Sequence, residues 1–358
     1  MPTQSNFRLL VVRLGAMGDI LHALPAVTAL RIAHPEWIID WVVEPKWAAL
    51  LSTHEAASRD TGSHRARQPV VDALLPAAAK QWGRHPLTSQ TLRELGTLRR
   101  TLRKNRYDAA VDFQGAFRSA WFARFARCRV IGEAEPREWA AHWLFTERIK
   151  THGAHVIEQD YELAAAIAGD QLSYVQPWLP CDPQAEAWAD SLLASSHNQH
   201  AVLINPGAGW GAKRWPIERY AIVAQQLASR GYRILVNAGP GEEPIAAVIV
   251  NATQGAATSL SPSLQNLIAV TRRVALVIAG DTGPLHLACA LGRPVVGIYG
   301  PTDPSRNGPF GTRFKVLRHP GSVRDHARRK EPEAGLLTIP PDDVLAAAEE
   351  LLGSQERP

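Results

Sequence analysis

The sequence lacks the features of membrane-spanning, disulfide-stabilised and zinc-binding proteins. No apolar run approaches the roughly 18 to 20 residues that a transmembrane helix requires, and the N-terminal region shows no basic segment with a long apolar core. The three cysteines, Cys128, Cys181 and Cys289, are scattered and form no CxxC pair. This usage is typical of a reducing compartment. We therefore expect a cytoplasmic protein whose cysteines are buried thiols.

Two common nucleotide-binding motifs are also missing. The glycine-rich stretch before Lys213 is not a Walker A loop, because Ala212 precedes the lysine and Arg214 follows it. Its glycines stand at alternate positions and do not match GxGxxG. These absences argue against a P-loop nucleotide hydrolase and against a Rossmann oxidoreductase.

The composition is that of a globular protein large enough for two domains. Of 358 residues, 46% are hydrophobic and 20% are charged. The net charge is +5 and the isoelectric point is near 9.3, which suits an anionic ligand or an anionic membrane surface. Basic residues are mixed with acidic ones and lack interleaved aromatics, so we expect no nucleic-acid partner.

Strand and helix patterns alternate along two halves of the chain, and this alternation predicts parallel sheets covered by helices. The expected strands are 9–12, 38–43, 109–113, 201–205, 233–237, 275–279 and 295–299, and the expected helices are 20–32, 92–104, 217–230, 243–251, 264–272 and 285–291. A proline-rich break, Gln176 to Pro183, separates the halves. We predict an α/β protein with two doubly wound Rossmann-like domains, 1–178 and 181–338, and a cleft between them.

Two segments lie outside this alternation. The C-terminal stretch 341–353 contains an amphipathic helix pattern after Pro340. It either packs on one domain, for which the N-terminal domain is the candidate, or bridges both. The stretch from Thr53 to Gln68 is polar and has no apolar period, so we interpret it as a loop.

The segment RLLVVRLGAMGDILHALP places a carboxylate at the end of a strand. Leu9 to Val12 is short and apolar, as a buried strand requires, and Gly15 and Gly18 permit a tight turn. Asp19 then stands at the start of the helix Ile20 to Ile32. It is either an N-cap or a functional carboxylate at the sheet edge where α/β proteins bind ligands.

Three strand-to-helix turns in the second half are candidates for binding phosphate and ribose. Asn205 to Lys213 has glycines that let backbone amides approach a ligand, and a lysine that adds positive charge. Ala279 to His286 places Thr282 and Gly283 at a helix start, where free amides attract anions. Gly239 to Glu243 offers carboxylates for ribose hydroxyls. Each turn also has a purely structural interpretation as a helix cap or connection.

Four of these segments resemble glycosyltransferase family 9, the ADP-heptose:lipopolysaccharide heptosyltransferases. They are GDILHALPAV, NPGAGWGAKRWP, AGPGEE and AGDTGPLHLACALGRPVVGIYGPTDP, and the resemblance extends over about 8–309. DWVVEPKWAAL, DFQGAFRSA and REWAA make the chain most similar to type I members. The resemblance implies a GT-B fold and an inverting mechanism without a metal or other cofactor. It also implies an ADP-L-glycero-D-manno-heptose donor and a lipid-linked Kdo acceptor of the lipopolysaccharide inner core.

The resemblance also implies site residues. Asp19 would be the general base and Lys213 would stabilise the departing ADP. The implied donor-binding residues are Gly207, Ala208, Gly209, Lys213, Glu242, Pro262, Asp281, Thr282, Gly283 and His286. The implied acceptor-binding residues are Gly18, Lys80, Arg84, Arg118 and Arg137. The sequence contains no Asp-x-Asp motif, which agrees with a metal-independent reaction.

The sequence departs from the family pattern at several positions. Ala208 and Gly209 stand where type I relatives carry hydroxyl residues, and Pro262 replaces a methionine. Gln81 and Gly83 stand where arginine is frequent. The basic residues between Arg93 and Arg106 either contact the cytoplasmic face of an anionic inner membrane peripherally or form a solvated helix face.

Two other interpretations remain open from the sequence. One is a family member that uses another nucleotide-sugar or acceptor, including a type II heptosyltransferase. The other is a sugar-nucleotide epimerase on the same architecture.

Overall fold

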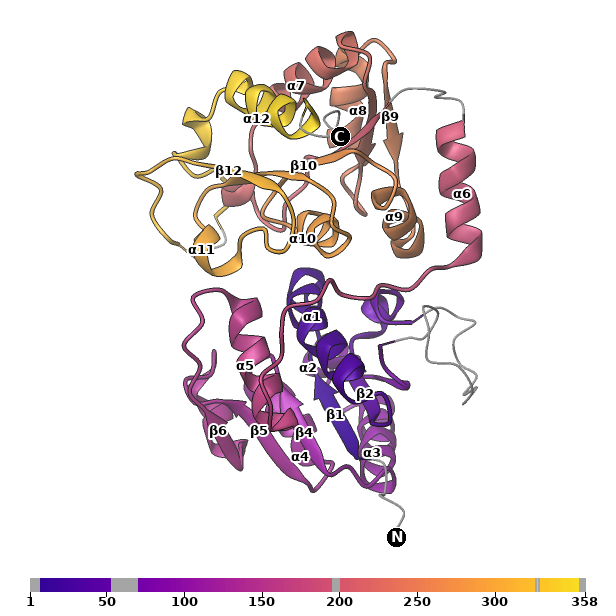
Figure 1. The fold of residues 1–358 in the computed structure, drawn as a ribbon, viewed down its shortest axis with the longest axis vertical. Helices are drawn as coiled ribbons and strands as arrows, with labels where there is room; N and C mark the ends of the chain where they lie inside the picture. The colour runs from indigo at the N-terminus through magenta and orange to yellow at the C-terminus, as the bar shows by residue number, and fades with distance from the viewer. Residues whose placement is uncertain (1–6, 53–69, 195–199, 326, 328, 354–358) are drawn as a thin grey trace. The chain divides into compact units, whose positions relative to one another are not determined.

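The computed structural model describes residues 7–52, 70–194, 200–325, 327 and 329–353 (Figure 1). Two compact units, Met1–Pro180 and Cys181–Pro358, make up the chain, and they meet within the proline-rich segment noted in the sequence. Each unit contains one six-stranded sheet whose strand pairs are all parallel.

The sheet of the first unit has the order β3-β2-β1-β4-β5-β6. Its strands are β1 (Arg8–Val12), β2 (Ile38–Val43), β3 (Ala73–Pro76), β4 (Ala109–Asp112), β5 (Arg129–Glu133) and β6 (Glu147–Ile149). The helices are α1 (Met17–Ala33), α2 (Ala79–Arg84), α3 (Ser89–Lys104), α4 (Phe117–Arg124) and α5 (Val156–Ala168), with 3-10 turns η1 (Pro45–Leu50) and η3 (Trp139–Leu144).

Helices bury the central strands of this sheet on both faces. Leu9, Leu10, Val11 and Val12 of β1 are fully buried, as a continuous apolar run in a parallel sheet predicts. The helices α1 and α5 pack against each other, while α3, α4 and η3 contribute to one hydrophobic cluster with β1 and β4. All residues of this cluster come from the first unit.

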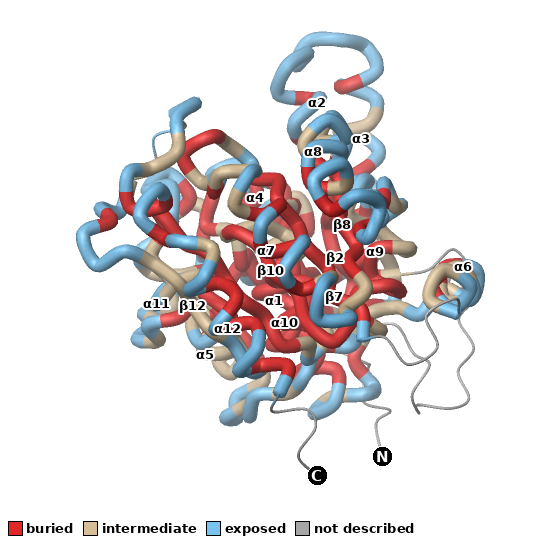
Figure 2. Tube along the Cα trace, turned by 90° about the horizontal axis from the view of Figure 1, so that it is seen from above, coloured by how far each residue is buried: buried red, intermediate tan, exposed pale blue. Residues whose placement is uncertain are grey.

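The second unit repeats the same strand order, β9-β8-β7-β10-β11-β12. Its strands are β7 (Ala201–Asn205), β8 (Arg233–Asn237), β9 (Ala257–Leu260), β10 (Leu276–Gly280), β11 (Val295–Tyr299) and β12 (Phe314–Arg318). Its helices are α6 (Pro183–Ala194), α7 (Ile217–Ser229), α8 (Glu243–Ala252), α9 (Leu264–Thr271), α10 (Gly283–Ala290), α11 (Pro304–Asn307) and α12 (Pro341–Gly353), with 3-10 turns η4 (Gly211–Lys213) and η5 (Leu336–Thr338). Figure 2 shows its central strands as mainly buried and α6 as largely accessible.

The C-terminal helix α12 belongs to the second unit. Val344, Leu351 and Leu352 are buried in the hydrophobic cluster of that unit, and α12 contacts α7, β10, β11 and β12. The expectation that this helix packs on the N-terminal domain is therefore wrong, because its apolar face completes the core of the C-terminal one.

All the strands and helices expected from the sequence are present, with shifts of a few residues at their ends. Strands β3, β5, β6, β9 and β12 were not predicted. The expectation of buried thiols is correct for Cys289, whereas Cys128 is partly buried and Cys181 is exposed. The polar stretch Thr53–Gln68 lies outside the described residues. Within the described part of the chain, no helix has both the length and the apolar character needed to span a bilayer.

The strand order creates one switch point in each sheet. From β1 the chain moves outward in one direction to β2 and β3, and β4 to β6 follow on the other side of β1. The loops after β1 and β4 therefore diverge, and so do those after β7 and β10. In sheets of this topology ligands bind at the carboxyl ends of these strands. The glycine turns found in the sequence follow β1, β7 and β10.

Candidate functional site

The turn after β1 is shaped by a close contact with an indole ring. Gly15 has a positive φ of 151°, and a Cβ atom there would lie 2.7 Å from Nε1 of Trp47. Only glycine fits at this contact. The helix α1 then begins at Met17, so Gly18 lies inside the first helical turn. Asp19 is the third residue of the helix and not its cap, which corrects the position expected for it.

A backbone hydrogen bond and an ion pair hold the carboxylate of Asp19. Its Oδ2 accepts a hydrogen bond from the backbone N–H of Ala16 at 2.8 Å, and its Oδ1 lies 3.2 Å from Nη2 of Arg13. Arg13 is buried and also donates to the carbonyl of Phe113 after β4. The Asp19 side chain keeps 33% of its surface exposed. The carboxylate is thus fixed in orientation and still accessible.

A second carboxyl group lies behind this pair. Asp160 of α5 is 3% exposed, and its Oδ2 has no hydrogen-bond partner among the described residues. Burial raises the pKa of Asp160 to about 8, against the opposing effect of the Arg13 charge, and the charges of Asp19 and Glu133 raise it further. Asp160 is therefore largely neutral at pH 7. Because the neutral Asp160 carries no charge to compete for the guanidinium of Arg13, Arg13 pairs with Asp19.

The loop after β4 is organised by Asp112. This buried carboxylate accepts hydrogen bonds from the N–H of Gln114, at 2.7 Å, from the N–H of Gly115 and from the hydroxyl of Ser119. Burial raises the pKa of Asp112 to about 6 despite these hydrogen bonds. Gln114 in turn accepts a hydrogen bond from the N–H of Leu14. The loops after β1 and β4 are thus joined at the switch point.

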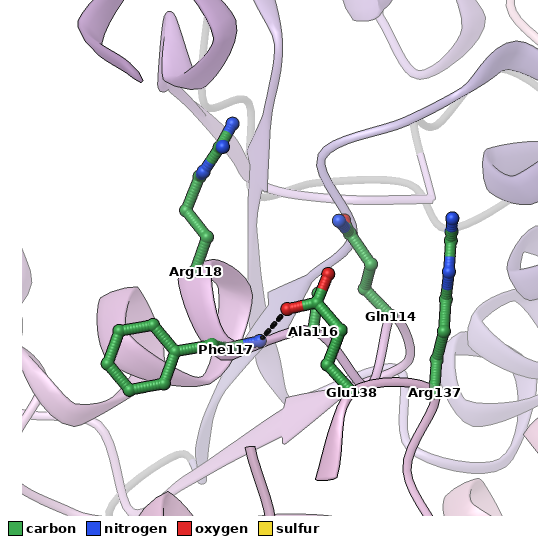
Figure 3. Close-up of a pocket in the computed structure, with 6 residues that line it drawn as sticks. All are labelled: Gln114, Ala116, Phe117, Arg118, Arg137 and Glu138. Carbon is green, nitrogen blue, oxygen red and sulfur yellow. Dashed lines mark hydrogen bonds between the residues drawn. The ribbon is translucent and has the colours of Figure 1, made fainter. Parts of the chain in front are cut away.

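A pocket of about 280 Å³ opens beside this loop (Figure 3). It is lined by Gln114, Ala116, Phe117, Arg118, Arg137 and Glu138. The carboxylate of Glu138 accepts a hydrogen bond from the N–H of Phe117 at 2.9 Å, which ties the loop after β5 to the start of α4. In Figure 3 the side chains of Gln114, Arg118 and Arg137 point in one direction, whereas the Phe117 ring points away from them. The pocket is polar and cationic.

The structure brings the other expected acceptor residues close to this pocket through α2. Arg118 donates a hydrogen bond from Nη1 to the carbonyl of Ala79, and its Nη2 would lie 3.5 Å from a Cβ atom at Gly83. Lys80 and Arg84, which flank these two positions, are exposed on the same short helix. Gly18 is separate from this group, in the first turn of α1.

In the second unit, the carboxylate of Glu242 lies against the glycine loop after β7. A Cβ atom at Gly207 would lie 2.1 Å from both Oε1 and Oε2 of Glu242, so no other residue fits there without displacing that side chain. Glu242 also accepts a hydrogen bond from the N–H of Gly239 at 3.0 Å. Asn237 donates to Asn205 at 2.5 Å. The loops after β7 and β8 therefore meet at the carboxyl edge of the sheet.

A buried charged cluster lies at the switch point of this sheet. Lys213 forms an ion pair with Oδ2 of Asp281, and Nε2 of His286 lies 3.2 Å from Oδ1 of the same carboxylate. All three side chains are about nine-tenths buried. Burial alone would raise the pKa of Asp281, but the hydrogen bond from His286 and the charge of Lys213 hold it well below its usual range. The Lys213 ammonium also lies 4.3 Å from the ring centre of Trp210.

The remaining expected donor residues lie at the same edge. Thr282 is the N-cap of α10, and Gly283 is its first residue. The hydroxyl of Thr282 lies 3.4 Å from the amide nitrogen of Asn205. Ala208 is buried and Gly209 is exposed in the loop after β7, while Pro262 lies just after the end of β9.

Among the residues that the structure describes, no group of three or more histidine, cysteine or carboxylate side chains is placed to hold a metal ion. The positive charge at the second site comes from Lys213 and from the N-terminus of α10.

Three residues of the first site were missed from the sequence. Arg13 is a charged residue directly after a buried strand, which is itself a signal for the sheet edge. Asp160 shares the apolar face of α5 with Ile157, Leu163 and Ala164, and a carboxylate on such a face is an identifiable anomaly. Asp112 ends a buried strand and could have been recognised by its position before a glycine turn.

Two six-stranded parallel sheets of this order, each flanked by helices, define the GT-B fold of glycosyltransferases. The structure is similar to E. coli heptosyltransferase WaaC with ADP, with a TM-score of 0.77 and 27% identity over 96% of this chain and 100% of that one. The same enzyme with ADP-2-deoxy-2-fluoro heptose matches with a TM-score of 0.75 and 28% identity, covering 96% of this chain and 99% of that one.

The sequence comparisons give the family. The model of glycosyltransferase family 9 (heptosyltransferase) matches residues 95–335. Lipopolysaccharide heptosyltransferase 1 of Escherichia coli O18:K1:H7 is 30% identical over 325 residues, which is 88% of this chain and 92% of that protein. The chain belongs to glycosyltransferase family 9.

The buried carboxyl of Asp160 predicts a pH-dependent stability. An unfolded aspartate loses its proton near pH 4, whereas Asp160 in the folded protein does so near pH 8. Its contribution to the free energy of unfolding therefore falls as the pH rises between these values, by about 1.4 kcal/mol per pH unit at most. In Asp160→Asn this loss is absent. The melting temperature of the variant relative to wild type should rise from pH 5 to pH 8. The exposed Asp170→Asn is the control, and a difference that stays constant with pH would contradict the assignment.

Proposed function

We propose that the protein is an inverting heptosyltransferase of lipopolysaccharide core biosynthesis. It transfers heptose from ADP-L-glycero-D-manno-heptose to a Kdo residue of the inner core. The observation that carries this proposal is the Lys213–Asp281–His286 cluster beside the N-terminus of α10. This cluster lies at the switch point of a sheet in a chain similar to an enzyme solved with ADP and with an ADP-heptose analogue.

The donor half of the reaction belongs to the second unit. Lys213 and the free amides at Thr282 and Gly283 bind the diphosphate, because they combine a cation with a helix N-terminus. Asp281 and His286 hold the lysine in place. Glu242 accepts hydrogen bonds from the ribose hydroxyls. The backbone of Gly207, Ala208 and Gly209 approaches the nucleotide, and the backbone at Pro262 contacts adenine.

The acceptor half belongs to the first unit. Arg118 and Arg137 line the pocket, and their guanidinium groups suit the carboxylate of Kdo or a phosphate of its lipid anchor. Lys80 and Arg84 extend this cationic surface from α2. Gly18 exposes backbone in the first turn of α1, next to Asp19.

Asp19 is the general base of the proposed reaction. It takes the proton from the acceptor hydroxyl as that oxygen bonds to the anomeric carbon, and the bond from this carbon to the phosphate oxygen breaks at the same time. ADP leaves with the bonding electrons, so the configuration inverts. Arg13 and the N–H of Ala16 orient the Asp19 carboxylate, and each of its oxygens retains a second lone pair for the proton.

The charge that develops on the departing ADP meets groups that are already in place. Lys213 and the N-terminus of α10 supply positive charge and N–H donors without reorganisation. We infer a metal-independent reaction from this arrangement. The lipid-linked acceptor would place the protein on the cytoplasmic face of the inner membrane, as a peripheral protein.

The first prediction concerns the base. Asp19→Asn keeps the size of the side chain and removes its ability to accept a proton. The kcat for heptose transfer should fall by about 10²- to 10⁴-fold, while the Kd for ADP stays within about twofold of wild type. Asp170→Asn, an exposed substitution in the same unit, should change neither value. Wild-type turnover by Asp19→Asn would exclude this residue as the base.

The second prediction concerns the leaving group. Lys213→Ala removes a cation that acts on the diphosphate in both the bound donor and the transition state. ADP binding, measured by calorimetry, should weaken by about tenfold, and kcat should fall by about 100-fold. The exposed Lys104→Ala is the control. Unchanged ADP affinity and turnover in a folded Lys213→Ala would remove the lysine from the site.

The third prediction concerns the metal requirement of the reaction. Wild-type protein treated with EDTA should keep its activity within about twofold, because protein groups stabilise the leaving ADP. Activity that EDTA abolishes and Mg²⁺ restores would overturn metal independence.

The fourth prediction concerns the substrates. Mass spectrometry of the products should show one heptose added to Kdo-lipid A from ADP-heptose and no transfer from UDP-sugars. Transfer only to an acceptor that already carries a heptose would assign a type II activity instead.

A further inference from the structure

Four large aromatic side chains are exposed on one part of the first unit. Phe117 and Trp121 of α4 are 48% and 40% exposed, and Trp139 and Trp143 of η3 are 69% and 66% exposed. Phe117 and Trp121 are four residues apart and lie on the same side of α4. We call these four residues, with Arg118 and Arg124 of the same helix, the aromatic–arginine surface.

None of these four aromatic residues belongs to the hydrophobic cluster of the first unit, although the Trp121 ring contacts Phe122 and Phe125 at the border of that cluster. The inner side of α4 already supplies Ala120, Phe122 and Ala123 to the core of the first unit, and Ala141 of η3 joins them there. The rings of Trp139 and Trp143 lie 5.4 Å apart at 90°. Each of these two residues leaves about two-thirds of its surface exposed. Exposed apolar groups gathered in this way mark an interaction surface.

The charge around these rings is positive. Arg118 and Arg124 lie on the outer side of α4, at helical spacing from Phe117 and Trp121, and α4 contains no acidic residue. The neighbouring helix α3, which contributes to the same core cluster, has five basic residues and one acidic residue. The acidic side chain nearest the rings in sequence is Glu138, whose carboxylate is engaged by the N–H of Phe117.

We propose that the aromatic–arginine surface docks the protein on an anionic phospholipid bilayer. Tryptophan concentrates at the level of lipid headgroups, where an amphipathic ring contacts both apolar and polar groups. Arginine binds lipid phosphates and is attracted by the negative surface potential. A second copy of this surface is a poor partner, because two sets of arginines would then face each other.

The surface is continuous with the pocket of the first unit. Phe117 and Arg118 belong to both, and in Figure 3 the Phe117 ring points away from Arg118, Gln114 and Arg137. A lipid-linked sugar could therefore enter the pocket while its acyl chains stay in the bilayer beneath the aromatic rings. This last step rests on the proposed function, whereas docking itself rests only on the composition of the surface.

The arginines of α3 play a secondary part in this arrangement. Arg93 and Arg100 donate hydrogen bonds from Nε to backbone carbonyls of their own helix, Ser89 and Gly96. They add positive charge near the bilayer. The aromatic side chains on α4 and η3 insert into the bilayer, whereas the charged side chains only attract the protein to its surface.

The test is co-sedimentation of the full-length protein with vesicles. We expect wild type to bind vesicles that contain phosphatidylglycerol and not vesicles of phosphatidylcholine alone. The double variant Trp139→Ser/Trp143→Ser should bind these vesicles at least about tenfold more weakly than wild type. Arg124→Ala should weaken vesicle binding by about fivefold. The control Trp178→Ser removes a tryptophan of similar exposure to Trp121, at 40%, outside this surface, and should bind as wild type does. Thermal melting checks that each variant is folded.

Several results would overturn the proposal. One is wild-type vesicle binding by a folded double variant, and another is an equal loss in Trp178→Ser. A third is a wild-type dimer in size-exclusion chromatography that the double variant converts to a monomer, without any vesicle binding. The outcome is separable from the proposed function. Tryptophan-dependent binding by a protein that transfers no heptose would refute only the proposed function, whereas transfer to a water-soluble acceptor without vesicle binding would refute only the docking.

Discussion

Both candidate sites depend on the reversal of strand order in a parallel sheet. Neighbouring strands β1 and β4 lead into connections that diverge, and so do β7 and β10. Backbone at the carboxyl ends of such strands has no adjacent loop to cover it, so side chains and ligands gather there. In the first unit Gln114 spans this gap by accepting from the N–H of Leu14. In the second, Lys213 spans it by pairing with Asp281.

The two sites use charge in opposite ways. Asp281 is enclosed by Lys213 and His286, and its strongly lowered pKa keeps it ionised at neutral pH. Such a carboxylate orients a cation and does not exchange protons. Asp19 is held by Arg13 and by one backbone N–H, and a third of its side chain stays exposed. A carboxylate that is fixed but accessible suits proton transfer.

The central strands and the glycine turns could be predicted from the sequence, because buried parallel strands are short, nearly uninterrupted apolar runs. The outer strands could not: β6 and β12 are only partly buried, and β5 has a buried run of only three residues, so none of them shows a long apolar run. The first turn of α1 was assigned to the preceding loop, since Gly18 is a poor helix former and the hydrogen bond from Ala16 to Asp19 is invisible in the sequence. Arg118 and Arg137 of the pocket were expected from the family resemblance, but their meeting in one pocket is not visible in the sequence, because one side comes from the loop after β4 and the start of α4 and the other from the loop after β5.

Each unit has a hydrophobic cluster built entirely from its own residues, and α12 completes the second one. Two separate cores imply two cooperative folding units, so unfolding of the whole chain need not follow a two-state transition. A nucleotide that binds only the second unit would raise the free energy of unfolding of that unit alone. Calorimetric scans with ADP would then separate two overlapping transitions, and a single fluorescence probe would report on whichever unit contains it. The proline-rich segment between the units is where the chain changes from one folding unit to the other.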